Sequence, residues 1–383
     1  MNIKELDRQY IANTYRRFDL QITSGKGALC YDETGKEYID MTSGIGVNAF
    51  GFCDERWQEA IREQAAALSH TSNLYYTEPC VRLAQLLCKK TGMKKVFFSN
   101  SGAEANECAI KVARKYAAEH KGADYYHIIT LNKSFHGRTL TTLAATGQES
   151  FHQLFTPLTE GFLYADAEDI EGLKALVDNN KVAGIMLEVV QGEGGVNALS
   201  KDYLQTVQTL CDEKDLVLIV DEVQTGIGRT GRFYSYMRYD LHPDVVSSAK
   251  GLAGGLPMGA TLMSEKVESV LSFGDHGSTF GGNPVCASAA LSVVSRIDDS
   301  FLKEVEEKGA YIKQELESIG ATVSGLGMML GIKTDKAVSE ILSECMEKGV
   351  LCLSAKDKLR LLPPLNIEWE QLQKAVQIIK ETL

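Results

Sequence analysis

Residues 216–221 read Leu-Val-Leu-Ile-Val-Asp, five apolar side chains closed by an acid. An uninterrupted apolar run of this length predicts a strand with both faces buried, as in a parallel sheet. Further strand-length runs occur at 95–99, 126–131, 182–190, 244–248 and 259–263. Amphipathic stretches such as 104–120 and 167–177 lie between them, an alternation typical of right-handed crossovers. The sequence therefore predicts an α/β fold with a mostly parallel sheet flanked by helices.

Two domains are expected, because the chain has 383 residues and single cores rarely grow past roughly 250–300 residues. The strand-rich region is assigned to a large domain over residues 42–283. Beyond it the pattern is mostly helical, with one strand-like piece at 328–333, so we expect a smaller α/β domain over residues 284–383. The polar, turn-rich residues 1–41 are expected to pack against this small domain.

The composition argues against several kinds of partner and site. The chain has 40 Lys and Arg against 51 Asp and Glu, a net charge of −11 without a basic stripe, so no nucleic acid is expected. No apolar run reaches the roughly 20 residues that span a bilayer, and residues 1–5 lack the apolar region of a signal peptide. Nine scattered cysteines without a Cys-x-x-Cys pair predict neither a disulfide scaffold nor a zinc site. We therefore expect a cytoplasmic protein with no membrane span and no metal.

Small residues follow the first predicted strand, at the sheet edge where open parallel sheets bind ligands. Ser101, Gly102 and Ala103 stand there at the start of a predicted helix. Their size allows a ligand to approach the backbone closely, and a helix N-terminus favours a phosphate. The alternative is a plain N-cap by Ser101, and the residues alone leave both interpretations open.

Phe135 and Arg138 share a short loop after the predicted strand at 126–131. An aromatic ring and a guanidinium are suited to stacking on a planar ligand and holding a carboxylate. The simpler alternative is a surface arginine beside a core phenylalanine. His136 lies between them, but no second histidine occurs at ligand spacing, so it is assigned no role.

Two charged residues stand at the ends of buried runs, Asp221 directly after 216–220 and Lys250 one residue after 244–248. Asp221 would be costly if left unpaired, so it either caps a turn or faces a cation such as a protonated pyridine nitrogen. Lys250 follows 244–248 between Ala and Gly, where burial would lower its pKa and make the amine nucleophilic. A lysine whose charged end reaches solvent is the alternative. Glu193, in the Gly-rich exit of 182–190, is expected at the same rim.

Residues 226–231 read Gly-Ile-Gly-Arg-Thr-Gly and match the G-x-G-x-x-G fingerprint of dinucleotide sites. That fingerprint begins directly after a strand and opens a helix. Here residues 221–225 intervene and no helical apolar period follows, so a nucleotide site is not expected.

Six motifs occur together along the chain. They are SGAEANE at 101–107, FHGRT at 135–139, LEVVQGEGG at 187–195, VDEVQTGIGRTG at 220–231, SSAKGLAGGLPMGA at 247–260 and STFGGNP at 278–284. Each is weak alone, but together they resemble the class III aminotransferases of pyridoxal phosphate (PLP) fold type I, and within them the acetylornithine aminotransferases. The resemblance extends from about Thr14 to Leu365. One departure is residues 51–55, Gly-Phe-Cys-Asp-Glu, where the family has Gly-His-x-His-Pro.

The resemblance implies a set of residues that bind PLP. Lys250 would hold the cofactor covalently, and Asp221 would keep its pyridine nitrogen protonated. The remaining contacts would be Gln224 at the phenolic oxygen, Phe135 and Val223 on the two faces of the ring, and Ser101, Gly102 and Ala103 at the phosphate. Thr279 from a second copy of the chain would complete the phosphate site, which implies a homodimer with active sites at the interface.

The resemblance also implies how substrates bind. Arg138 and Arg360 would bind carboxylates, and Ser278 would belong to the same substrate site. Glu193 would pair with Arg360 and mask the second carboxylate site until glutamate or 2-oxoglutarate arrives.

The reaction implied is transfer of the δ-amino group of N2-acetylornithine to 2-oxoglutarate, giving N-acetylglutamate 5-semialdehyde and glutamate in arginine biosynthesis. Gly44 stands where ornithine aminotransferases carry a tyrosine, which favours an acylated amino donor. Ornithine, succinylornithine and 4-aminobutyrate are the alternative donors. A non-catalytic binding protein with the same fold is the alternative from another functional class.

Overall fold

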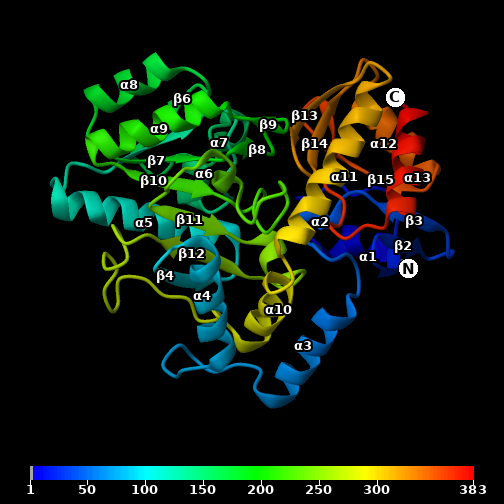
Figure 1. The fold of residues 1–383 in the computed structure, drawn as a ribbon, viewed down its shortest axis with the longest axis horizontal. Helices are drawn as coiled ribbons and strands as arrows, with labels where there is room; N and C mark the ends of the chain where they lie inside the picture. Colours follow the sequence, from blue (N-terminus) through cyan, green and yellow to red (C-terminus); the bar gives the residue numbers. More distant parts are fainter. Residues whose placement is uncertain (1–2) are drawn as a thin grey trace.

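The computed structural model describes residues 3–383, so residues 1 and 2 of the expected N-terminal segment lie outside the described part. A seven-stranded sheet forms the larger half of the molecule (Figure 1). Its strands, in spatial order, are β4 (Lys95–Ser99), β12 (Gly259–Met263), β11 (Val245–Ser248), β10 (Val217–Asp221), β7 (Val182–Leu187), β5 (His127–Leu131) and β6 (Phe162–Ala165). Neighbours from β11 to β6 are parallel, whereas β12 is antiparallel to β11 and to β4. The predicted α/β fold with a mostly parallel sheet is confirmed.

The six predicted strands all occur, with small shifts at their ends. The run 182–190 divides, because β7 ends at Leu187 and β8 (Val190–Gln191) pairs with β9 (Asn197–Ala198). The edge strand β6 was not predicted from the sequence. Its four residues, Phe-Leu-Tyr-Ala, are apolar, but the run is shorter than those that predicted the other strands.

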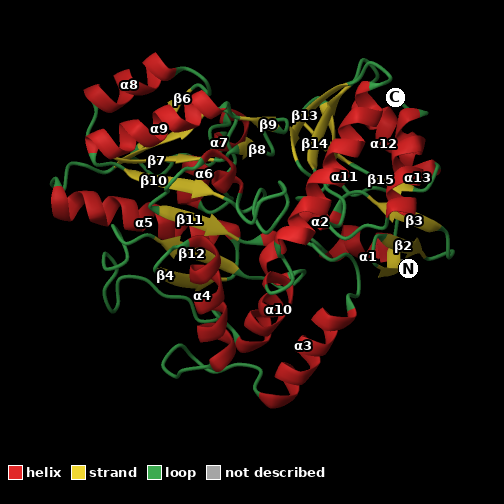
Figure 2. Cartoon of the chain, viewed as in Figure 1, coloured by secondary structure: helices red, strands yellow, loops and turns green. Residues whose placement is uncertain are grey.

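Helices surround the sheets (Figure 2). They are α1 (Ile3–Tyr10), α2 (Ser43–Gly46), α3 (Glu55–Ala67), α4 (Glu78–Thr91), α5 (Gly102–His120), α6 (Leu140–Ala145), α7 (Glu149–His152), α8 (Ile170–Asn179), α9 (Lys201–Lys214), α10 (Pro284–Val294), α11 (Asp299–Glu317), α12 (Val338–Glu347) and α13 (Trp369–Lys380), with 3-10 turns η1 (Ser235–Tyr239) and η2 (Lys250–Ala253). Within residues 3–383 no helix combines the length and the apolar character needed to cross a membrane.

Strand β10 shows why the large sheet is covered on both faces. Val217 and Ile219 pack in one apolar cluster with α5, whereas Leu218 and Val220 pack in another with α9. Successive strand residues point to opposite faces, so a strand between two helical layers must be apolar throughout. The run that predicted the fold therefore reflects burial from both sides.

The C-terminal residues form a second sheet that the sequence predicted only in part. Its order is β13 (Thr322–Leu326), β14 (Met329–Lys333), β17 (Lys358–Leu361) and β16 (Leu353–Ala355), with antiparallel pairing throughout. The sequence indicated β14 alone. β13 and β16 contain Ser or Gly in the middle, and β17 alternates charged and apolar residues, so none of the three forms an apolar run.

The N-terminal residues also form strands. β1 (Ile22–Lys26), β2 (Leu29–Asp32) and β3 (Glu37–Asp40) make a sheet with β15 (Val350–Leu351), in which β3 and β15 are parallel. By contrast, α10, which begins just after residue 283, packs on α3 and α4 (Figure 1). The domain divisions at 41/42 and 283/284 stay predictions.

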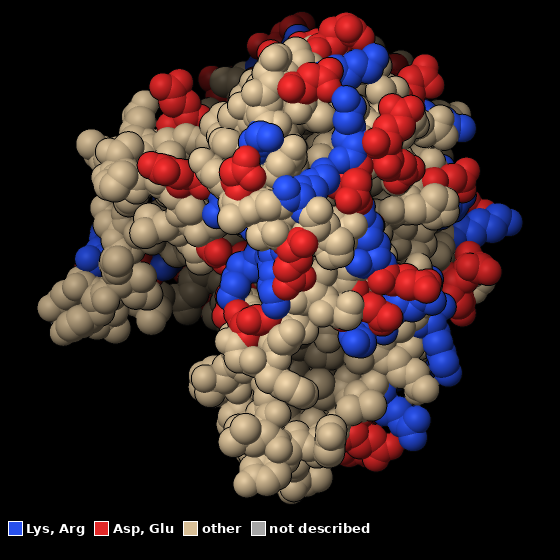
Figure 3. All heavy atoms as spheres, turned by 90° about the vertical axis from the view of Figure 1, so that its left-hand side faces the viewer, with Lys and Arg blue, Asp and Glu red and all other residues tan. Residues whose placement is uncertain are grey.

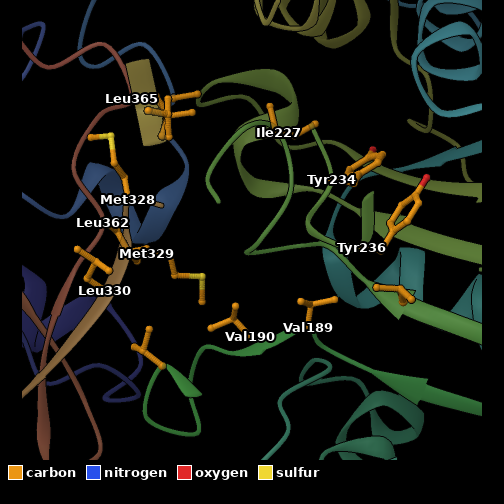
Figure 4. Packing of buried hydrophobic residues seen from close by; sticks show 14 of the residues in the cluster. Val189, Val190, Ile227, Tyr234, Tyr236, Met328, Met329, Leu330, Leu362 and Leu365 are labelled. Atoms are coloured by element: carbon orange, nitrogen blue, oxygen red, sulfur yellow. The ribbon is translucent and has the colours of Figure 1, made fainter. Parts of the chain in front are cut away.

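One apolar core joins the large sheet to the C-terminal sheet. Figure 4 shows Val189 and Val190, which follow β7, in the same cluster as Met328 and Met329 at the start of β14. Ile227, from the loop after β10, belongs to this cluster too. The loops at the carboxyl edge of the large sheet are therefore packed directly against the strand next to Arg360.

Candidate active site

A cavity of about 480 Å³ opens at the ends of β4, β5, β10 and β11. Each of these strands is followed by a loop that reaches the cavity, so one edge of the sheet collects side chains that are distant in sequence. The residues predicted from the sequence that line it are Ser101, Gly102, Ala103, Phe135, Arg138, Asp221, Val223, Gln224 and Lys250.

Asp221 is buried at the end of β10, and three donors hold its carboxylate. Oδ1 accepts from the Val223 N–H at 2.9 Å, and Oδ2 accepts from Asn106 Nδ2 and His136 Nδ1, both at 2.8 Å. Because a carboxylate only accepts, Nδ1 carries the histidine proton here. The buried Nε2 of His136 has no hydrogen-bond partner among residues 3–383. Sequence analysis assigned His136 no role, because this contact joins the loop after β5 to the end of β10, which meet only in the folded chain.

Lys250 begins η2, with Ala249 between it and β11, and has a φ of 43°. A left-handed backbone at a residue other than glycine costs on the order of 1–3 kcal/mol and is often found at functional sites. Burial lowers the pKa of Lys250, and the charges of Glu193 and Asp221 oppose that shift. The amine makes no hydrogen bond or ion pair within the described part of the chain. A lowered pKa favours the neutral amine, which is the nucleophilic form.

The N-terminus of α5 forms another wall of the cavity. Ser101 caps the helix, since its Oγ accepts from the Glu104 N–H at 3.2 Å. A Cβ on Gly102 would lie 2.7 Å from Val223 Cγ1, so a larger residue there would displace Val223. The first turn of a helix has N–H groups without partners inside the helix, and these favour an anion. The N-cap and the predicted phosphate site are therefore compatible.

Buried Arg360 and half-buried Glu193 form an ion pair beside the cavity residue Gln224. Arg360 Nη1 lies 2.5 Å from Glu193 Oε1 and 3.3 Å from Gln224 Oε1. Gln224 Nε2 donates to Glu193 Oε1 at 3.3 Å. Burial alone would raise the pKa of Glu193, but the charge and hydrogen bond of Arg360 outweigh it and lower the pKa. The structure thus brings together the two residues that the sequence assigned to a switch.

Arg138 lies on the loop after β5 and is exposed to solvent. Its guanidinium carbon is 5.3 Å from the centroid of the Phe135 ring and 4.1 Å from that of Phe151. Stacking on aromatic rings orients a guanidinium while leaving its N–H groups available. Arg138 therefore keeps its N–H groups open to the cavity, in contrast to Arg360.

Glu188 also lines the cavity and was not assigned a role from the sequence. Its Oε2 accepts from the Phe135 N–H at 3.0 Å, and its Oε1 accepts from the Gly192 N–H at 3.3 Å. Burial raises the pKa of Glu188 to about 7; His136 opposes the shift and Asp221 adds to it. Its signal in the sequence is an acid inside the apolar run 182–190.

Ser278 and Thr279 lie outside this cavity. They line a separate one of about 630 Å³, together with Asn73 and Phe98. Ser278 Oγ accepts from Asn100 Nδ2 at 3.1 Å, which places it near the start of α5, while Thr279 is exposed. Within residues 3–383 no group of three or more His, Cys, Asp and Glu side chains is arranged to hold a metal ion.

A family model and individual relatives all assign the chain to one family of enzymes. Residues 10–383 match the family model described as "Aminotransferase class-III". The acetylornithine aminotransferase of Haemophilus ducreyi is 52% identical, with 100% of this chain and 98% of that protein covered. That of Aquifex aeolicus is 46% identical, with 98% and 100% covered.

Solved structures with the same fold are also aminotransferases. The ornithine aminotransferase from Toxoplasma gondii ME49 has a TM-score of 0.95 at 31% identity, covering 99% of this chain and 93% of that chain. The N-acetylornithine aminotransferase from Stenotrophomonas maltophilia K279a has a TM-score of 0.85 at 34% identity, covering 99% and 97%.

The cofactor of class III aminotransferases is PLP, and the cavity suits it. Asp221 offers a buried carboxylate for a cationic ring nitrogen, and Lys250 offers an amine without a partner. Gly102, at the start of α5, leaves the first helical turn open to a phosphate. The resemblance read from the motifs is confirmed, and the chain belongs to the class III aminotransferases, enzymes that transfer amino groups with pyridoxal phosphate.

Proposed function

We propose that this aminotransferase moves the δ-amino group of N2-acetylornithine to 2-oxoglutarate, giving N-acetylglutamate 5-semialdehyde and glutamate. The observation that carries the proposal is the contrast between two arginines. Arg138 is open at the cavity, whereas Arg360 is buried and paired with Glu193. A donor with one carboxylate needs one arginine, and a dicarboxylate needs both. The acetylornithine aminotransferases that are 52% and 46% identical to the chain support the same donor.

The residues around the cavity would divide the work on the cofactor. Bound PLP supplies a carbonyl group for the substrate amine and a ring that withdraws electrons. Lys250 holds it through the amine and, once released, moves a proton from the substrate carbon. Asp221, fixed by three donors, keeps the ring nitrogen protonated. The other contacts are Phe135 and Val223 on the ring faces, Gln224 at the phenolic oxygen, and Ser101, Gly102 and Ala103 at the phosphate.

Glu193 would act as a removable mask on Arg360. Nη1 of Arg360 is used by Glu193 and Gln224, whereas its buried Nε has no partner among residues 3–383. A substrate carboxylate that replaces Glu193 can take over its bond to Nη1 and pair with the guanidinium in the bidentate arrangement that arginine favours. N-acetylornithine binds through Arg138 and leaves the mask in place. Glutamate and 2-oxoglutarate bring a second carboxylate and displace it.

The turn at Gly44 supports an acylated donor. Gly44 has a φ of 62°, and a Cβ there would meet Asn48 Nδ2 at 3.6 Å and Val47 Cβ at 3.9 Å. Both are ordinary contact distances, so space remains beside Val47, which lines the cavity. That space suits an acetamido group, where a tyrosine would crowd it.

The proposal includes a homodimer in the cytoplasm. Large apolar side chains are exposed on the loop between α3 and α4 and near Thr279, including Leu74 at 86%, Tyr76 at 98% and Phe273 at 111%. Figure 3 shows few charged side chains at the lower end of the molecule, where Figure 1 places this loop. Exposed apolar surface of this kind marks an interface. Thr279 and Ser278 would reach the active site of the other subunit from there.

A panel of amino donors with 2-oxoglutarate tests the proposal, with glutamate formation as the readout. N-acetylornithine should react fastest. Gly44→Tyr should slow the acylated donor more than ornithine, and Gly44→Asn, which tolerates a left-handed backbone, controls for strain. A clear preference of the wild type for ornithine, succinylornithine or 4-aminobutyrate would refute the donor. Bound PLP without turnover of any donor would mean a binding protein.

A further inference from the structure

Arg229 is a buried guanidinium in the Gly-rich run 226–231, and none of the steps above uses it. It is 2% exposed and lies in the loop between β10 and η1. Burial lowers the pKa of Arg229, and the charge of Asp40 opposes that shift. A charge is stable inside a protein only where its partners replace the lost water, so the partners of Arg229 indicate its role.

Nη1 of Arg229 binds residues that flank β17, the strand that contains Arg360, and its neighbour β14. Nη1 of Arg229 donates to the carbonyl oxygens of Met328 at 3.2 Å and Pro363 at 2.5 Å. The backbone oxygen of Arg229 accepts from the Met328 N–H at 3.0 Å. Met328 immediately precedes β14 and Pro363 follows β17, and within these strands Gly331 pairs with Arg360. The loop after β10 is thus tied to both strands at one end of the pair that carries Arg360.

Nη2 of Arg229 binds Ser43, which in turn binds the residue that follows β17. Nη2 of Arg229 donates to Ser43 Oγ at 3.2 Å, and Ser43 Oγ donates to the carbonyl oxygen of Leu362 at 2.6 Å. Leu362 is two residues beyond Arg360. Ser43 has a φ of 42°, a strained backbone that needs support from its surroundings. Arg229 and Ser43 therefore hold consecutive carbonyls of one short segment.

We propose that Arg229 is a positioning residue that sets the place of Arg360 relative to Gln224 and Asp221 across the cavity. It contacts neither substrate nor cofactor. Arg360 Nη1 lies 3.3 Å from Gln224 Oε1, so a small displacement of β17 breaks the alignment of the second carboxylate site. The inference rests on the proposed function in one respect, namely that Arg360 binds a carboxylate of glutamate.

The test is Arg229→Lys, which keeps the charge but lacks the planar fork that spans the carbonyls of Met328 and Pro363 and the Ser43 hydroxyl. Single-turnover rates are measured with glutamate, which needs Arg360, and with ornithine, an unacylated donor with one α-carboxylate for Arg138. The glutamate rate should fall about 10- to 100-fold, the order expected for a misplacement of about 1 Å. The ornithine rate should fall much less, and the absorbance of the lysine-bound cofactor should remain. The ratio of the two rates is decisive, because partial unfolding lowers both equally.

Arg296→Met is the matched control. Arg296 is a largely buried arginine whose Nη2 lies 2.8 Å from Asp54 Oδ1, at the start of α3 rather than beside Arg360. Its loss should lower the unfolding temperature without changing the rate ratio. Should Arg229→Lys fail to hold PLP, Ser43→Ala removes one arm of the same support and should shift the ratio in the same direction.

An unchanged ratio in a folded variant, or equal losses with both donors, would overturn the proposal. Failure of N-acetylornithine to react with the wild type would refute the donor assignment instead. The test of Arg229 would still stand. It needs only glutamate and one unacylated amine with a single carboxylate that the wild type accepts.

Discussion

Gly102→Ala should weaken PLP binding through a steric effect that the structure makes measurable. The added Cβ would lie 2.7 Å and 2.9 Å from the two γ-carbons of Val223. Carbon atoms in contact prefer about 3.5–4.0 Å, so Val223 must move by roughly 1 Å. Overpacking of this kind costs about 1–3 kcal/mol. If the strain falls on the cofactor-bound state, the dissociation constant of PLP should rise about 5- to 150-fold.

The assay is a titration of cofactor-free enzyme with PLP, read from the absorbance of the lysine-bound cofactor. Gly102→Ala, Val223→Ala and the double variant form a cycle, with thermal unfolding of each to confirm the fold. Because Val223→Ala removes the atoms that clash, the double variant should regain most of the affinity lost in Gly102→Ala. Additive losses in the cycle would refute the reasoning, since additivity means that the two side chains do not interact.

Three further outcomes are expected. Lys250→Ala should abolish turnover and the covalent trapping of PLP by borohydride, and a trapped adduct in this variant would identify another anchor. Asp221→Asn should bind PLP but lose most of its kcat, because an amide cannot hold the ring nitrogen protonated; near-native turnover would contradict this role. Burial alone would raise the pKa of Glu193, but Arg360 outweighs it and lowers the pKa from its ordinary value of 4.5. The stability that their ion pair contributes is therefore present above pH 4.5 and is lost as pH falls through the lowered pKa. The difference in unfolding free energy between wild type and Glu193→Gln should therefore shrink as pH falls through this lowered pKa in urea titrations, and a pH-independent difference would exclude the mechanism.

Strands buried on both faces were predictable because their burial leaves a direct mark in the chain. Val217 to Val220 are all apolar, since alternate residues meet α5 and α9. The edge strand β6 is apolar but only four residues long, so it lacks this mark. β13 and β16 are partly exposed and contain Ser or Gly, so the apolar pattern is interrupted there.

In the candidate site, too, some residues could be predicted from the sequence and others could not. Ser101, Asp221 and Lys250 stand out because each follows a strand at an edge where ligands bind. His136, Glu188 and Arg229 were missed or dismissed. Their importance lies in partners from other loops: Asp221 for His136, and the Phe135 N–H for Glu188.

The sequence by itself determined the α/β class, the strand ends that bear the reactive groups, and the family, because apolar period and motif order are properties of the chain alone. Only the tertiary structure decided which of these groups meet. The ion pair of Arg360 with Glu193 and the bonds of Arg229 to Met328 and Pro363 join residues roughly 100 to 170 positions apart. Such contacts arise when packed sheets bring their edges together, and no local pattern records them.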